Sequence, residues 1–329
     1  MIAYDYFYRE RLPLDSQWSV GWDLFVSSWD DSERVAQVYE MANAARKDWL
    51  VHPEYGFTLS NRPVGPSVID VPAEEDRAML GYVDALVRDG FDLHATRICV
   101  DITGMMRPHL MFLLKLLHQR GVRCLDFVYA EPKTYFGREN TRFNDGDILD
   151  VREVIGFQGL NTPTGVEEIL IVAPGFDELS LDAVIGDKEG ATRVEIFGLP
   201  SLQPDMYQLN VLKAYRTDSP QPDTYSPARR FASASDPFAV ASELSRTVEH
   251  YRRVGEKRFY LSPLATKAQA LGFALFYLAE CEGTSTSIIY PVTGSYAPRT
   301  GKSISGIWRY TVDFNLMDVL VARAVAEGC

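Results

Sequence analysis

The sequence has few cysteines and no long apolar segment, and both absences narrow the class of protein. Its 329 residues include only four cysteines, and no two of them form a Cys-x-x-Cys pair. A secreted scaffold held by disulfides and a zinc knuckle both need such pairing, so neither is expected. No apolar run approaches the roughly 18 residues that a membrane span requires, and the first residues lack the pattern of a secretory signal. We therefore expect a cytoplasmic protein without a membrane partner.

Basic residues are also in the minority. The chain has 33 Lys and Arg against 45 Asp and Glu, which gives a formal net charge of −12. Proteins that bind long nucleic acids nonspecifically use a basic surface to neutralise phosphates, so this balance argues against a long nucleic acid as partner. A single basic pocket remains compatible with it, because net charge governs long-range attraction and not one site.

Bulky apolar side chains, by contrast, are plentiful. Hydrophobic residues make up 46% of the chain and charged residues 24%, which is ordinary for a folded protein. The 17 Phe, 17 Tyr and 5 Trp residues supply ample core material. Because 329 residues exceed the usual size of one hydrophobic core, two domains are expected.

The first half of the chain alternates between strand-like and helix-like segments. A capping box at Asp30 and Glu33 predicts the start of a helix, and apolar residues at helical spacing continue it from Val35 to Ala45. Gly121 is the stop signal of a later helix. The predicted strands are residues 22–26, 49–51, 96–102 and 122–129, and the later predicted helices are 73–89 and 107–120.

The second half repeats this order. Its predicted strands are 168–173, 193–197, 257–262 and 287–291, and its predicted helices include 237–254 and 268–280. The strand and turn before Arg107 match those before Lys267, about 160 residues further along. Strands that alternate with helices indicate parallel sheets covered on both faces. We predict an α/β fold of two tandem Rossmann-like parallel-sheet units forming a pseudodimer; convergence of two generic α/β units is the alternative.

Turn-forming residues mark the expected boundaries between the two units. Residues 1–136 are the first Rossmann-like unit, 137–165 a connecting segment and 166–329 the second Rossmann-like unit. The connecting segment carries turn sequences at 144–146 and 161–163 around a strand-like stretch at 150–156. Residues 306–314 alternate like an edge strand of the second unit, and residues 316–327 close it as a helix.

Chemistry is expected where parallel strands end, because ligands of open parallel sheets bind outside the carboxyl ends of the strands. Hydroxyls, backbone N–H groups and one cation at a helix start suit an anion such as a phosphate. Each of these residues also has a purely structural reading, in which the hydroxyls cap helices and the cations face solvent. The candidate residues at strand ends are Ser27, Ser28, Trp29, Thr103, Gly104, Arg107, Pro174, Gly175, Ser262, Thr266 and Lys267.

Two of these segments resemble a known family. The stretches Asp101-Ile-Thr-Gly-Met-Met-Arg107 and Ser262-Pro-Leu-Ala-Thr-Lys267 each join a strand to a helix. They look like the loop of CRISPR-associated Rossmann-fold (CARF) domains, and two such units in one chain resemble the SAVED type. The resemblance implies a sensor of cyclic oligonucleotides that binds its ligand between the two halves. The first loop lacks the family's second glycine, and Pro263-Leu264 replaces both glycines in the second.

Other motifs point elsewhere or are absent. Gly301-Lys-Ser303 ends like a phosphate-binding P-loop but lacks its first glycine, and neither a GxGxxG nor a GxSxG sequence occurs. No His lies at metal spacing from a carboxylate. We therefore expect no metal and no bound cofactor. Trp29, Tyr135 and Tyr296 are candidates for stacking on bases, with ordinary packing as the alternative.

These observations leave three hypotheses. The first is a ligand-sensing regulatory protein that binds a nucleotide or cyclic oligonucleotide, acting in antiphage defence with a separately encoded effector protein. The second is an enzyme on the same scaffold that acts on phosphate-containing nucleotides, with Asp101, Ser262 and Lys267 as its catalytic residues. The third is a protein-interaction subunit whose pocket has decayed. Fold alone decides between none of them.

Overall fold

A computed structural model describes residues 1–135, 148–161, 164–203, 206–216, 228–296 and 301–326, without the side chains of Tyr135, Tyr215 and Arg216. The chain forms two units, each assembled from separate stretches. The N-terminal unit comprises Phe7–Asp145 and Ser295–Met317, and the C-terminal unit comprises Met1–Tyr6, Gly146–Gly294 and Asp318–Cys329. The turn sequence predicted at 144–146 and residues 162–163 of the second one lie outside the described residues.

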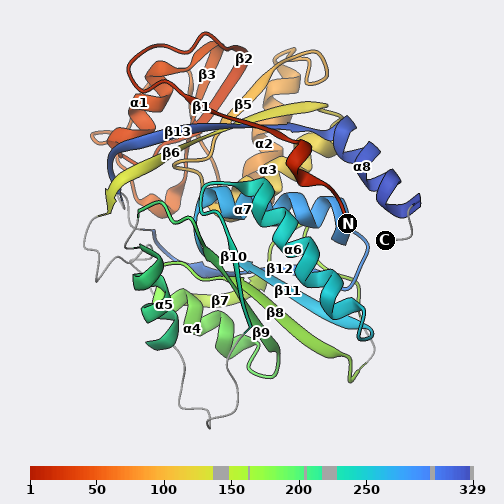
Figure 1. Ribbon diagram of the computed structural model, residues 1–329. Helices are drawn as coiled ribbons and strands as arrows, with labels where there is room; N and C mark the ends of the chain where they lie inside the picture. Colours follow the sequence, from red (N-terminus) through yellow and green to blue (C-terminus); the bar gives the residue numbers. More distant parts are fainter. Residues whose placement is uncertain (136–147, 162–163, 204–205, 217–227, 297–300, 327–329) are drawn as a thin grey trace. The chain divides into compact units, whose positions relative to one another are not determined.

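Seven strands form the sheet of the N-terminal unit, in the order β1-β13-β6-β5-β2-β3-β4. Strands β6, β5, β2, β3 and β4 run parallel, whereas β13 pairs antiparallel with both β6 and β1. Helix α1 covers one face, and α2 and α3 cover the other (Figure 1). The elements are β1 (Tyr8–Leu12), β2 (Gly21–Ser28), α1 (Glu33–Met41), β3 (Asn43–Val51), the 3-10 helix η2 (Pro53–Tyr55), β4 (Val68–Asp70), α2 (Glu75–Arg88), β5 (Ile98–Asp101), α3 (Arg107–Gln119), β6 (Cys124–Tyr135) and β13 (Gly301–Asp313).

Six strands form the sheet of the C-terminal unit, in the order β10-β9-β8-β11-β12-β7. All are parallel except β7, which pairs antiparallel with β12. Helices α4 and α5 lie on one face, and α6 and α7 lie on the other (Figure 1). The elements are the 3-10 helix η1 (Tyr4–Tyr6), β7 (Ile148–Glu153), β8 (Glu167–Ala173), α4 (Glu178–Asp187), β9 (Thr192–Gly198), α5 (Met206–Arg216), β10 (Ala228–Ala232), α6 (Pro237–Arg252), β11 (Lys257–Pro263), α7 (Lys267–Phe276), the π-helix η3 (Tyr277–Cys281) and β12 (Thr286–Thr293), while α8 (Phe314–Ala326) spans the division between the units.

The two units share one strand order. In each, the second and third strands lie on one side of the first strand, and the fourth and fifth strands lie on its other side. This is the order 3-2-1-4-5 of a Rossmann-like sheet. The predicted α/β fold of two Rossmann-like units is therefore confirmed. In both units the order reverses between the first and the fourth strand, which are β2 and β5 in one unit and β8 and β11 in the other.

Packing explains why the central strands are apolar on both sides. Phe25 and Val26 of β2, and Ile171 and Val172 of β8, are almost fully buried. A parallel strand covered by helices on both faces needs this continuous apolar run, whereas a half-exposed strand alternates.

The first helix differs from the prediction at both ends. Its N-cap is Ser32, whose hydroxyl accepts a hydrogen bond from the Val35 N–H, so Asp30 and Glu33 form no capping box. The helix ends at Met41, and residues 43–51 pair with β2 as strand β3, so Ala45 is not helical. Tertiary pairing overrides the helix propensity of this stretch.

The last strand also departs from expectation. Residues 301–313 form β13, which lies between β1 and β6 in the sheet of the N-terminal unit and is not an edge strand of the second unit. Its register places Ile307 opposite Leu12 of β1 and Ala130 of β6, and all three side chains are buried in one core. The N-terminal residues Met1–Tyr6 belong to the C-terminal unit.

Candidate functional site

In the N-terminal unit, polar side chains meet where β2 and β5 end side by side. Ser27 and Asp101 face each other in the register of the two strands, and both are fully buried. The Ser27 hydroxyl donates to Asp101 Oδ2 at 2.8 Å, and the Thr103 N–H donates to Oδ1 at 2.9 Å. Burial raises the pKa of Asp101 to about 6, although the hydrogen bonds from Thr103 and Ser27 oppose that rise.

The loop after β5 packs directly on the end of β2. A Cβ atom at Gly104 would overlap with the carbonyl oxygen of Ser28, so only glycine fits there. The Thr103 hydroxyl accepts a hydrogen bond from the Ala130 N–H at 3.0 Å and thereby ties the loop to β6. Tyr55 donates its phenol hydrogen to the Gly104 carbonyl at 3.1 Å. Gly104 thus allows the backbone of this loop to contact the backbone of β2.

Two histidines, which were considered above only as metal ligands and set aside, lie at this strand end. His52 follows β3 directly, and its Nε2 lies 3.0 Å from the Ser28 hydroxyl oxygen. The ring of His109, from the first turn of α3, meets the His52 ring edge-on with centroids 4.5 Å apart. Both imidazoles are buried. The position of His52 in the sequence could have identified it as a candidate, because it directly follows β3 just as Trp29 directly follows β2.

The remaining N-terminal candidates are spread along the same edge of the sheet. Arg107 is the first residue of α3 and is buried. Trp29 meets Trp49 edge-on and donates its indole N–H to the Asn61 carbonyl at 3.2 Å. Tyr296 is tilted against Tyr55, with ring centroids 6.2 Å apart. The side chain of Tyr135, at the end of β6, is outside the described part of the chain.

The C-terminal unit repeats the backbone arrangement at the ends of β8 and β11. Here a Cβ atom at Gly175 would overlap with the carbonyl oxygen of Leu264. The glycine lies in the loop after the first strand of this unit, whereas Gly104 lies in the loop after the fourth strand of the other unit. Pro174 precedes it, and its carbonyl accepts a hydrogen bond from the Asn210 amide at 2.8 Å. The Ser262 hydroxyl is fully buried at the end of β11 and has no hydrogen-bond partner among the described residues.

Thr266 starts helix α7 with a full capping box. Its hydroxyl oxygen accepts from the Gln269 N–H at 3.1 Å, and the Gln269 side chain accepts from the Thr266 N–H at 3.3 Å. The same hydroxyl lies 2.5 Å from the Ala234 carbonyl and donates to it. Lys267 is the first residue of α7 and is half-buried. Arg107 and Lys267 therefore occupy equivalent places, each at the start of the helix after the fourth strand.

One cation at this edge was missed. Lys213 of α5 donates to the Phe176 carbonyl at 2.8 Å, within the loop that follows Pro174 and Gly175, and its side chain is buried. A helix over residues 206–216 was not predicted, so Lys213 had no expected position near this loop. The helix has only 11 residues, which is too short for its apolar spacing to predict it securely.

These residues suit an anionic ligand better than a metal ion. In the C-terminal unit, α4 and α7 both begin at the strand-end edge, and free N–H groups at helix starts attract anions. Lys213 and Lys267 add positive charge there, and Glu178 lies 3.9 Å from the Lys213 ammonium group and offsets part of it. Across the described ranges, no group of three or more His, Cys, Asp or Glu side chains is placed to hold a metal ion. No helix in those ranges has the length and apolar character to cross a membrane.

Comparison with known proteins leaves the function open. No family model and no curated protein matches the chain. A precorrin-6A reductase, CobK, is similar in structure at a TM-score of 0.23 and 13% identity, over 82% of this chain and 89% of that one. A ketoreductase domain from the bacillaene assembly line is similar at a TM-score of 0.19 and 12% identity, over 82% and 67%. Likeness at this level says nothing about activity.

Proposed function

We propose that this protein is a ligand-binding regulatory protein that senses a nucleotide or cyclic oligonucleotide through its strand-end loops. One observation carries the proposal. Each unit places hydroxyls, a helix start and a basic residue where its strand order reverses, which is where open parallel sheets bind ligands. In the C-terminal unit, Lys267, Lys213 and the N–H groups of α4 and α7 would contact phosphate. In the N-terminal unit, Trp29 and Tyr296 would stack on bases.

The finer parts of the proposal rest on the resemblance of the two loops to CARF and SAVED proteins. In this proposal the ligand is a second messenger of antiviral defence, the protein works in the cytoplasm, and a separately encoded effector protein receives the signal. The scattered cysteines support the reducing compartment.

An enzyme on the same scaffold is the second candidate. The observation that favours it is the Ser28–His52 pair, because a hydroxyl within hydrogen-bonding distance of an imidazole is the geometry of an activated nucleophile. Asp101 supports it too, since strongly shifted carboxyl groups gather at functional sites. Such an enzyme would act on phosphate-containing nucleotides, with Ser262 and Lys267 as its counterparts in the other unit.

A thermal-shift panel separates the candidates. The probes are ATP and the cyclic di-, tri- and tetra-adenylates, tested on the wild type, on Lys267→Ala and on Arg107→Lys. A ligand present at about 100 times its Kd adds roughly 2.7 kcal/mol, which is several degrees in Tm. Lys188→Ala is the matched control, because Lys188 is a half-buried lysine of the same unit at the far end of α4.

The expected result is a shift in the wild type and in Lys188→Ala that is much reduced in Lys267→Ala, with the ligand recovered unchanged by chromatography. Recovery of a cleaved ligand would replace the sensor with the enzyme. If no probe shifts the wild type, both nucleotide proposals fail and a protein-interaction subunit is the reading that remains.

A further inference from the structure

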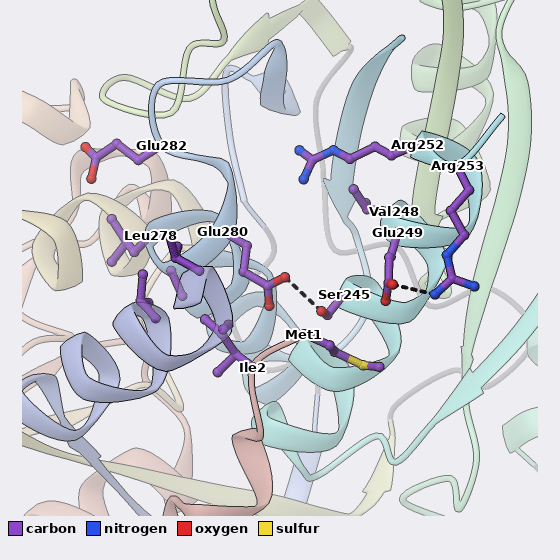
Figure 2. Close-up of a pocket in the computed structure, with 14 residues that line it drawn as sticks. Met1, Ile2, Ser245, Val248, Glu249, Arg252, Arg253, Leu278, Glu280 and Glu282 are labelled. Carbon is purple, nitrogen blue, oxygen red and sulfur yellow. Dashed lines mark hydrogen bonds and ion pairs between the residues drawn. The ribbon is translucent and has the colours of Figure 1, made fainter. Parts of the chain in front are cut away.

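A cavity of about 460 Å³ opens in the C-terminal unit, at the edge of its sheet opposite the strand-end loops. It lies between the end of α6, the π-helix η3, the end of α8 and the first two residues (Figure 2). Its volume falls within the range of small-molecule sites in proteins. The apolar part of its wall comprises Ile2, Val248, Leu278, Val321, Ala324 and Val325.

Three carboxylates line the cavity, and one of them, the half-buried Glu280, lies beside its apolar wall. Glu280 reaches from η3 toward α6, where its Oε2 accepts from the Ser245 hydroxyl at 2.8 Å (Figure 2). Its Oε1 accepts from the Tyr4 hydroxyl at 2.9 Å. Burial raises the pKa of Glu280. The hydrogen bonds from Ser245 and Tyr4 oppose that rise, as do the positive charges of the Met1 ammonium group and Arg252, which also line the cavity. No basic side chain of the described residues forms an ion pair with Glu280.

The backbone that presents Glu280 is itself unusual. Residues Tyr277–Cys281 form a π-helix directly after α7, and the Glu282 N–H donates to the Tyr277 carbonyl at 3.0 Å, five residues back. Such π-turns are rare and are frequently found at functional sites. Leu278, Ala279 and Glu280, which line the cavity, all come from this turn.

We propose that this cavity binds a small organic cation with an apolar body, such as a primary alkylamine. The ammonium group would contact Glu280, whose carboxylate oxygens keep unused lone pairs, and the apolar body would lie against the valine and leucine side chains. At the rim, Arg253 pairs with Glu249 at 2.5 Å, so that pair carries little net charge toward the ligand. An anionic head group is disfavoured because it would face the Glu280 carboxylate. The site is independent of the proposed nucleotide function.

Calorimetric titration of the full chain with three matched probes tests this proposal. Hexylammonium, hexanol and hexanoate share one apolar body and differ only in the head group. We expect saturable binding of hexylammonium, at least tenfold weaker binding of hexanol and none of hexanoate. Glu280→Gln should weaken hexylammonium binding at least tenfold, whereas the matched rim variant Glu249→Gln should leave it within twofold.

A second variant protects the test against misfolding. Ala324→Leu adds bulk to the apolar wall and touches none of the hydrogen bonds of Glu280, so it should block hexylammonium while the Tm stays near the wild-type value. Equal affinity for hexanol and hexylammonium would overturn the proposal, since the cavity would then be selective only for apolar bulk. Binding of hexanoate, or failure of all three probes to bind, would overturn it as well.

Discussion

The hydroxyl of Ser27 donates a 2.8 Å hydrogen bond to the carboxyl group of Asp101, across the two strands between which the order of the N-terminal sheet reverses. Both side chains are fully buried, so the carboxyl group has no water to stabilise its charge. This pair joins the ends of β2 and β5 at the edge where we place the ligand, and it makes the stability of that edge depend on pH.

The first prediction concerns Asp101→Asn. The pKa of Asp101 rises from 3.8 to about 6 on folding, so the folded protein binds this proton more tightly than the unfolded chain does. Protonation therefore stabilises the fold, and this contribution is present below pH 4 and is lost as the pH rises through 6. A shift of about two units corresponds to on the order of 3 kcal/mol.

Urea unfolding of wild type and Asp101→Asn between pH 4.5 and 7.5 checks this. As the pH rises, the free energy of unfolding of the wild type should fall relative to that of the variant. Ser27→Ala should move the wild-type titration to higher pH, because it removes a hydrogen bond that lowers the pKa. A difference between wild type and Asp101→Asn that stays constant with pH would show that the carboxyl group keeps an ordinary pKa.

The second prediction concerns Gly104→Ala. Its added methyl group would meet the Ser28 carbonyl oxygen, which belongs to the backbone and cannot turn aside, so we expect a loss of about 1–3 kcal/mol. Gly175→Ala should behave alike against Leu264. Gly81→Ala in α2 is the control: a Cβ atom there meets nothing within 4 Å, and the variant should gain up to about 1 kcal/mol. Equal effects at Gly104 and Gly81 in denaturant unfolding would contradict the packing we describe.

The third prediction concerns the cap of α7. Thr266→Ala removes both the acceptor for the Gln269 N–H and the donor to the Ala234 carbonyl, and should cost about 1–2 kcal/mol of stability. Thr266→Ser keeps both hydrogen bonds and should stay within about 0.5 kcal/mol of the wild type. Thermal unfolding of the two variants checks this, and a Ser variant as unstable as the Ala variant would mean that the methyl group, not the hydroxyl, matters.

Local patterns were enough to predict the parallel strands of both units. Residues 169–173 and 259–261 are continuous apolar runs, and a strand buried on both faces needs such a run. The repeat of strand, turn, basic residue and helix before Arg107 and Lys267 likewise reflects equivalent places in two sheets with one strand order.

Contacts between distant segments explain what the sequence could not predict. Residues 301–313 join the first sheet because they pair with both β1 and β6, and nothing within that segment identifies those partners. Residues 43–45 were predicted to be helical because Ala45 continues the helical spacing of the apolar residues before it, yet their pairing with β2 makes them strand. His52 and Lys213 were missed for the same reason, since their importance comes from neighbours such as Ser28 and Phe176.

Hydrogen exchange tests the central claim, that the strand-end loops bind a nucleotide, most directly. Amide exchange is measured by mass spectrometry with and without the adenylate that gives the largest thermal shift. The account predicts slower exchange in peptides that cover residues 26–29, 103–107, 174–178 and 262–267, and no change over residues 248–253 at the opposite edge of the C-terminal sheet. Protection confined to other segments, or no protection with any adenylate that was offered, would contradict it.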